Sequence, residues 1–159
     1  MPPEPVGPLP AVPVRRLARA DLDQVQTLVT QCPEAAQWSL QNLQQLFSPA
    51  DCAWVVELAG TNSICAFLSA RIVSDQAEIL NLAVAPGRRR LGHASSLFRE
   101  ALMEFRRRKA SSIFLEVRES NSAAIRFYER MLFVKSGIRP SYYRHPEEAA
   151  VVMVRKFTD

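Results

Sequence analysis

Residues 79–105 read ILNLAVAPGRRRLGHASSLFREALMEF, and this stretch predicts the arrangement around which the rest of the chain folds. Its first six residues are apolar except for Asn81, which is the length and composition of a buried strand. Pro86 and Gly87 end that run. After a run of arginines, apolar residues return at helical spacing with charged residues on the other face. The stretch therefore predicts a strand, a basic loop of small residues and an amphipathic helix.

The loop between this strand and this helix suits an anion. A helix N-terminus presents unpaired backbone N–H groups and the positive end of the helix dipole. Gly92 and Ala94 carry little or no side chain, so the backbone can approach a phosphate closely. The loop lacks the repeated glycines of a dinucleotide fingerprint and the Gly-Lys-Ser/Thr ending of a Walker loop.

The composition is that of one soluble globular domain. The chain has 159 residues, of which 48% are apolar and 23% charged. Its net charge of +4 is mild for a nucleic-acid binder, although RNA binding through residues 88–90 and 106–109 stays an alternative. The three cysteines form no CxxC pair, so we expect buried, reduced thiols in a cytoplasmic protein.

The first 13 residues are rich in proline and contain no basic residue. They lack the basic start and apolar core of a signal peptide, and we expect a disordered leader ahead of a single domain at 14–159. The chain contains no apolar run of the roughly 18 residues that cross a membrane. The sequence thus predicts one domain without a membrane role, present as a monomer or weak dimer.

The remaining elements follow from periodicity and turn residues. Strands are expected at 14–17, 52–59, 63–73, 77–84, 112–117, 133–138 and 149–157, and helices at 21–29, 40–47, 94–105 and 122–132. Asp21, Ser39 and either Asn121 or Ser120 are candidate N-caps, and 139–146 reads as a polar loop. The predicted fold class is α/β (α+β), a mixed and largely antiparallel sheet with helices on both faces. Strands four and five should be parallel, with a ligand where their carboxyl ends diverge.

Glu116 and Tyr128 are the candidate catalytic groups. Glu116 lies in an otherwise apolar strand, where a partly desolvated carboxylate suits a general base. The alternative is a structural ion pair with Arg118 or Arg126. Tyr128 shares a helix face with apolar residues, so it is either a core aromatic or a phenol that donates a proton to a leaving group.

Three aromatic residues in predicted loops are candidates for an acceptor site. Trp38 is either a satellite core residue or a wall of a substrate cleft. Tyr142 and Tyr143 either cover the core or shape a peptide slot, since aromatic rings give contact area at low entropic cost. Asn121 is a helix cap, a ligand contact or both.

Two patterns resemble the GNAT N-acetyltransferases, and within them the RimI-type ribosomal-protein-alanine N-acetyltransferases. Arg89-x-x-Gly92-x-Ala94 is similar to their Gln/Arg-x-x-Gly-x-Gly/Ala acetyl-CoA loop. The second pattern is Leu115-Glu116-Val117-Arg118-x-x-Asn121-x-x-Ala124-x-x-x-Tyr128, then Phe133, together with Arg139-x-x-Tyr142-Tyr143. Trp38-Ser39 resembles their Pro-Trp-Ser loop, with Gln37 in place of the proline. The resemblance covers about residues 14–157.

This resemblance implies a GNAT fold, acetyl-CoA as cosubstrate and no metal. It implies Glu116 as general base, Tyr128 as general acid, and Trp38, Tyr142 and Tyr143 as acceptor contacts. The implied acetyl-CoA contacts are Leu82, Ala83, Val84, Arg89, Arg90, Leu91, Gly92, His93, Ala94, Ser95 and Asn121.

The implied reaction is acetyl transfer to a protein N-terminal α-amine, that of an alanine in a small-subunit ribosomal protein. The alternatives are a GNAT acting on a lysine or a small amine, and a non-catalytic acyl-CoA-binding module. The chain departs from the family pattern at His93 and the pair Ser95-Ser96, where aliphatic residues are preferred, and at Ala149, where the family has aspartate.

Overall fold

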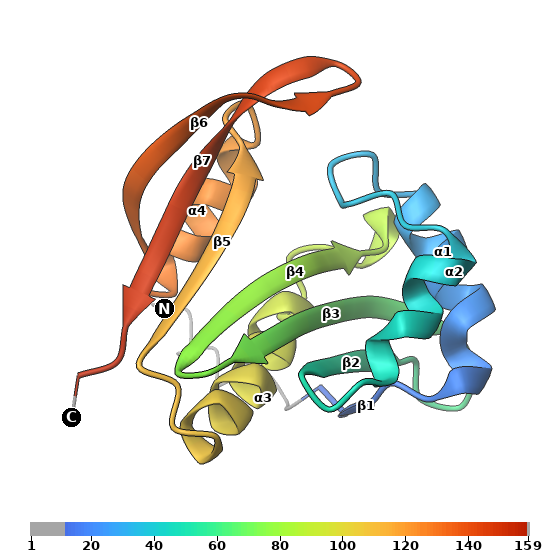
Figure 1. Cartoon of the computed structure of the whole chain (residues 1–159). Coiled ribbons are helices and arrows are strands. Elements are labelled where there is room, and N and C mark those ends of the chain that lie inside the picture. Colours follow the sequence, from blue (N-terminus) through green and yellow to red (C-terminus); the bar gives the residue numbers. More distant parts are fainter. Residues whose placement is uncertain (1–11, 159) are drawn as a thin grey trace, which may run out of the picture.

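The computed structural model describes residues 12–158 (Figure 1). The predicted leader therefore lies outside the described residues apart from Val12 and Pro13. The elements are β1 (Val14–Arg16), α1 (Leu22–Thr30), α2 (Leu40–Gln44), β2 (Asp51–Glu57), β3 (Ile64–Val73), β4 (Gln76–Val84), α3 (His93–Arg107), β5 (Ser112–Arg118), α4 (Ser122–Arg130), β6 (Val134–Arg144) and β7 (Glu147–Lys156). Short 3-10 turns occupy Arg19–Asp21, Gln45–Phe47 and Pro86–Arg88. No helix among the described residues is long and apolar enough to cross a membrane.

The seven strands form one sheet in the order β1-β2-β3-β4-β5-β7-β6. Every neighbouring pair is antiparallel except β4 and β5, which are parallel. The predicted element order and the predicted fold class are confirmed. The parallel pair arises because α3 forms a crossover connection between β4 and β5.

β4 and β5 pair over only three positions, from Gln76↔Ser112 to Glu78↔Phe114. Beyond them the two strands diverge toward their carboxyl ends, so that their ribbons form a V (Figure 1). We call this divergence of β4 and β5 the splay. The backbone groups that face it have no partner strand, so a ligand with amide groups can pair with them.

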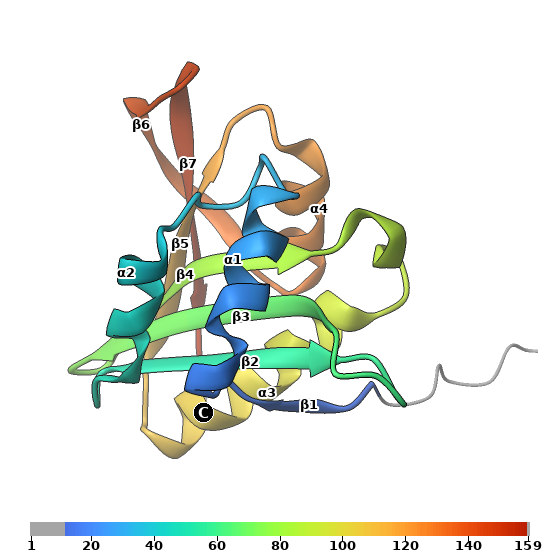
Figure 2. The ribbon, with the colours of Figure 1, turned by 90° about the vertical axis from the view of Figure 1, so that its right-hand side faces the viewer.

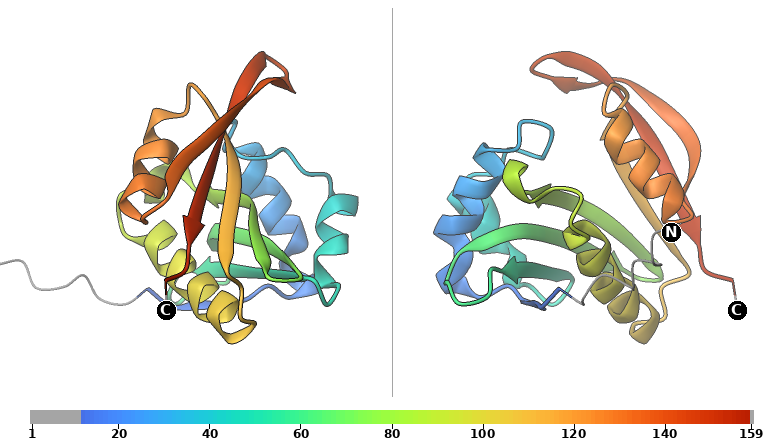
Figure 3. Two further views of the ribbon diagram at one scale, coloured as in Figure 1. Left: turned by 60° about the vertical axis from the view of Figure 1, so that its left-hand side comes forward. Right: turned by 180° about the vertical axis from the view of Figure 1, so that it is seen from behind.

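Two apolar clusters fill the space between the sheet and its helices. α1 and α2 cover one face of β2–β4, α3 covers the other face of these strands, and α4 lies on the same side as α3 but over β5–β7 (Figures 2 and 3). Leu97, Phe98 and Phe105 of α3 are fully buried against the sheet. Phe98 also contacts Phe127 of α4 edge to face, at 6.4 Å between ring centroids, and this contact joins the helices across the splay.

A bulge in β4 changes which side chains face which helices. Ala70 pairs with Ile79 but Ser69 pairs with Asn81, so Leu80 is an extra residue on β4. Before the bulge Ile79 faces the cluster under α3, and after it Leu82 packs against that same cluster. Asn81 consequently points to the α1–α2 face.

Two predictions about local structure were wrong. Asp21 does not cap α1, because its carboxylate accepts from the Ala18 N–H at 2.8 Å and pairs with Arg15 at 2.7 Å. Residues 139–146 are mostly strand and not a loop, since β6 continues to residue 144 opposite β7. A register shift between Arg139 and Tyr143 absorbs Pro140 and Ser141, the residues that suggested a loop.

Candidate active site

The basic loop ends at the start of α3, where Gly92 is the N-cap residue with φ of 84°. That left-handed conformation favours glycine, and no side chain of the described residues caps the helix there. The first backbone bond of α3 runs from the Ser96 N–H to the Gly92 carbonyl at 3.0 Å. The N–H groups of 93–95 are therefore left for water or an anion, beside three exposed arginines at 88–90.

Arg89 and His93 flank this helix terminus and have different surroundings. Arg89 forms an ion pair with Glu34, and its Nε donates to the Val84 carbonyl at 3.3 Å. His93 is buried, and neither of its ring nitrogens has a hydrogen-bond partner in the described part of the chain. Burial, together with the nearby charge of Arg88, lowers the pKa of His93, which keeps the ring neutral.

Glu116 lies on β5 beside the splay. Leu115 and Val117 belong to the cluster under α3 and α4, so strand alternation places Glu116 on the opposite face. Its side chain is only 10% exposed and pairs with Arg139 of β6 at 3.2 Å. The pairing partner is thus neither Arg118 nor Arg126, the two partners that the sequence suggested.

Tyr142 and Tyr143 contribute to the same site from β6. A hydrogen bond to the Glu116 carboxylate raises the pKa of Tyr142 to about 12, so its hydroxyl stays a donor. Burial and the charge of Glu116 raise the pKa of Tyr143. The Arg118 guanidinium stacks on the Tyr143 ring at 4.2 Å and pairs with Glu148 at 3.2 Å.

Tyr128 lies in an aromatic cluster on the α4 side. Its ring contacts Phe127 and Phe133 edge to face, with centroids 5.2 and 5.4 Å away. Burial raises the pKa of Tyr128 well above its usual value, and the neighbouring Tyr143 adds to the shift. The phenol therefore keeps its proton, which is the state that a general acid requires.

Asn121 caps α4, since its Oδ1 accepts from the Ala124 N–H at 3.2 Å, as the sequence predicted. The preceding Ser120 N–H donates to Glu148 at 2.6 Å. Glu148 thus connects the β6–β7 hairpin to the turn before α4, next to the position where Ala149 replaces the aspartate of the family pattern.

Trp38 packs against β3. It is half-buried and contacts Phe67 of β3 edge to face at 6.4 Å, which favours the satellite-core alternative. In the same segment the Gln37 amide donates to the carbonyls of Val29 and Cys32, both at 2.8 Å. The hydrogen bonds of Gln37 therefore stabilise this turn, at the position where the family pattern has a proline.

Sequence reasoning passed over two polar residues of β4. Glu78 lies on the same face as Glu116, and burial together with the charge of Glu116 raises the pKa of Glu78. Asn81 is 4% exposed and makes two hydrogen bonds to the segment before Trp38. The signal that could have identified both residues was the presence of a carboxylate and an amide within an otherwise apolar, buried strand.

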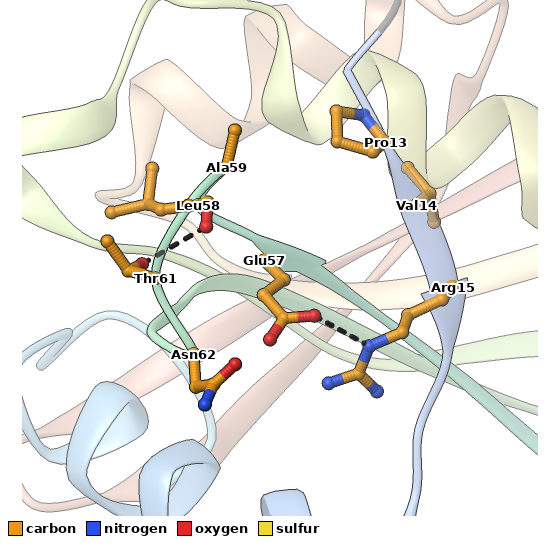
Figure 4. Close-up of a pocket in the computed structure, with 9 residues that line it drawn as sticks. Pro13, Val14, Arg15, Glu57, Leu58, Ala59, Thr61 and Asn62 are labelled. Carbon is orange, nitrogen blue, oxygen red and sulfur yellow. Dashed lines mark hydrogen bonds and ion pairs between the residues drawn. The ribbon is translucent and has the colours of Figure 1, made fainter.

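A pocket elsewhere on the molecule contains none of the predicted site residues (Figure 4). It lies between β1 and the β2–β3 hairpin, where Arg15 donates to Glu57 at 3.1 Å. Within residues 12–158 no group of three His, Cys, Asp or Glu side chains is placed to hold a metal ion.

Comparison with known proteins gives one consistent family. Residues 18–133 match the model of the Acetyltransferase (GNAT) family. The chain is 34% identical over 99 residues to the [ribosomal protein bS18]-alanine N-acetyltransferase of Escherichia coli K12, an alignment that covers 61% of this chain and 67% of the relative. It is 37% identical over 82 residues to a putative enzyme of the same name from Bacillus subtilis, covering 52% and 54%.

Solved structures agree with this relationship. The crystal structure of the ribosomal-protein-S18-alanine N-acetyltransferase from Escherichia coli superposes with a TM-score of 0.81 at 26% identity, covering 92% of this chain and 94% of that one. NAA60 of Arabidopsis thaliana in complex with acetyl-CoA also gives 0.81, at 17% identity and with 91% and 98% covered, which shows a shared fold.

Proposed function

The chain belongs to the acetyltransferase (GNAT) family, and on that premise we propose that it transfers an acetyl group from acetyl-CoA to the α-amine of a protein N-terminus. The acceptor that we propose is the N-terminal alanine of a small-subunit ribosomal protein, as in the names of the 34% identical relatives. The observation that carries the proposal is the placement of Glu116 and the start of α3 on opposite faces of the sheet, with the splay between them.

The residues of the basic loop fit acetyl-CoA. The N–H groups at the start of α3, together with Arg88 and Arg90, offer donors and positive charge to a pyrophosphate, whereas Arg89 would first have to leave its ion pair with Glu34. The backbone of 82–84 has no partner on the β5 side, so its groups that β3 leaves unpaired can pair with the amides of the pantetheine arm, although the Val84 carbonyl already accepts from Arg89 and Cys32. When bound, acetyl-CoA supplies a thioester carbonyl that an amine can attack.

The proposed proton transfers use both faces of the sheet. Glu116 accepts a proton from the acceptor ammonium, directly or through water, and the free amine becomes the nucleophile. Tyr128 donates its phenol proton to the departing sulfur from the α4 side. Backbone N–H groups at the carboxyl end of β4 stabilise the negative charge that develops on the carbonyl oxygen.

A carboxylate base suits an α-amine better than a lysine. The pKa of an α-amine is about 8, whereas that of a lysine is about 10.4, so an α-ammonium gives up its proton more readily. The cytoplasm is the compartment that we propose for this activity, and three buried, free cysteines are in keeping with a reducing environment.

The decisive experiment measures CoA release from acetyl-CoA with two hexapeptides. One begins Ala-Arg and has a free N-terminus, and the other is N-acetylated and carries an internal lysine. We expect turnover with the first peptide alone. Turnover with the lysine peptide alone would identify a lysine acetyltransferase, and acetyl-CoA binding without turnover on any amine would identify a binding module.

A further inference from the structure

The segment between α1 and α2, residues 31–39, lies on β4 without being a strand of the sheet. Its main connection to β4 is a side chain. The Ala36 N–H donates to Asn81 Oδ1 at 3.2 Å, and Asn81 Nδ2 donates to the Ala36 carbonyl at 2.9 Å. A carboxamide that both accepts from and donates to one residue reproduces the paired bonds of an antiparallel neighbour.

Burying the Asn81 side chain at this position costs free energy of folding unless its amide is hydrogen-bonded. Asn81 is 4% exposed within a strand that is otherwise apolar from 79 to 84. The bulge at Leu80 is what turns this amide toward Ala36. The bulge at residue 80 and the carboxamide of Asn81 are therefore both needed for the paired hydrogen bonds with Ala36.

The segment is held together as a unit. The Gln37 amide closes it by donating to the Val29 and Cys32 carbonyls. At the far end of β4 the Cys32 thiol donates to the Val84 carbonyl at 3.3 Å, beside the Arg89–Glu34 ion pair. The segment is thus attached to β4 at residue 81 and again at residue 84, on either side of 82–83.

β4 therefore contacts both the proposed acyl donor and the segment 31–39. The backbone of 82–84 is where the proposed function places the acyl donor, and the side chain of Asn81 fixes the segment that leads to Trp38. Asn81 and the proposed base Glu116 lie on the same face of the sheet, so residues 31–39 are fixed on the side from which the acceptor is proposed to reach the base. We propose that Asn81 is a positioning residue, which sets the alignment of the acceptor amine with the thioester by fixing residues 31–39 on β4. This proposal rests on the proposed function for the reaction that it affects.

Two substitutions test the role of the amide. Asn81→Ala removes both hydrogen bonds, and Asn81→Asp keeps an acceptor for the Ala36 N–H but cannot donate to the Ala36 carbonyl when ionised. Ser69→Ala is the matched control, because Ser69 is the register partner of Asn81 on β3, is fully buried, and has a hydroxyl without a partner among the described residues.

In both Asn81 variants we expect the KM for the acceptor peptide to rise about tenfold and kcat to fall. The reason is that the substitutions weaken or remove the two hydrogen bonds that hold Ala36 on β4. The Kd of acetyl-CoA, measured by calorimetry, should change less than twofold, and Ser69→Ala should match wild type throughout. An equal loss of acetyl-CoA affinity, or unchanged peptide kinetics, would overturn the proposal.

Amide hydrogen exchange separates this proposal from the proposed function. Exchange across 34–38 should be faster in Asn81→Ala than in wild type and unchanged in Ser69→Ala, whether or not an acceptor is present. If wild type acetylates no amine, the proposed function and the alignment role fail together, while faster exchange still shows that Asn81 holds the segment. Unchanged exchange would refute the attachment itself.

Discussion

At the scale of single residues, the surroundings of Glu116 decide how it can act. Its carboxylate pairs with Arg139 at 3.2 Å and raises the pKa of the neighbouring Tyr142, so it has a charged and a polar neighbour before any acceptor arrives. An incoming ammonium must share this carboxylate with the arginine. Because Arg139 is 59% exposed, its ion pair is easily replaced by another cation.

Glu116→Gln tests the proposed base. Glutamine keeps the shape of the side chain but cannot take up a proton, so we expect kcat to fall at least 100-fold. The Kd of acetyl-CoA should stay within twofold, as measured by calorimetry alongside steady-state CoA release. Glu119→Gln, on an exposed carboxylate of the following turn, is the control. A variant that retains more than a tenth of the wild-type kcat would exclude Glu116 as the base.

At the scale of elements, the sequence predicted which helices and strands exist better than it predicted what they bring together. Ser39 and Asn121 cap their helices as expected, because capping is a local contact. The partner of Glu116 was missed because Arg139 lies in β6, and Pro140 led to the prediction of a loop in this part of the strand. Asn81 was missed because a bulge cannot be placed by strand alternation alone.

Glu104 of α3 provides a test at this scale. It pairs with Arg107 and Arg108 at 2.6 Å and with Arg16 of β1 at 3.2 Å, so it connects the helix to the edge of the sheet. The Arg107 hydrogen bonds are the largest of the effects that lower the pKa of Glu104 to about 2. A lowered pKa means stability that is present above pH 4.5 and lost as the pH falls toward 2.

We therefore expect Glu104→Gln to lower the free energy of unfolding by about 1–2 kcal/mol at pH 7, allowing for water around the exposed Arg107. The difference from wild type should shrink between pH 4.5 and pH 2. Urea denaturation across this range measures it, with Glu100→Gln, one turn earlier on α3, as the control. A difference that does not depend on pH would contradict the assignment.

At the scale of the whole molecule, the sheet consists of two parts. β1–β4 form one and β5–β7 the other, and the sheet joins them through three paired positions of β4 and β5. The Phe98 contacts with Phe127 and Phe133 add a hydrophobic connection between α3 and the β5–β7 part. A ligand in the splay would touch both parts and stabilise their relative placement.

Acetyl-CoA should therefore stabilise the folded chain as a unit. At 100 times its Kd, a ligand that binds only the folded state adds about 2.7 kcal/mol to the free energy of unfolding. For a chain of this length, we expect the Tm to rise by about 5–10 °C. Scanning calorimetry with and without acetyl-CoA measures the rise. Two separate transitions, of which only one shifts, would show that the parts unfold independently.

The splay also has a kinetic consequence. The proposed base lies on one face of the diverging strands and the proposed acid and anion loop lie on the other, so we expect the acyl donor and the acceptor to reach the same point from opposite directions. Neither substrate needs to leave before the other arrives. Initial velocities measured against both concentrations should accordingly give intersecting reciprocal plots, and the enzyme should release no CoA in a burst when the acceptor is withheld.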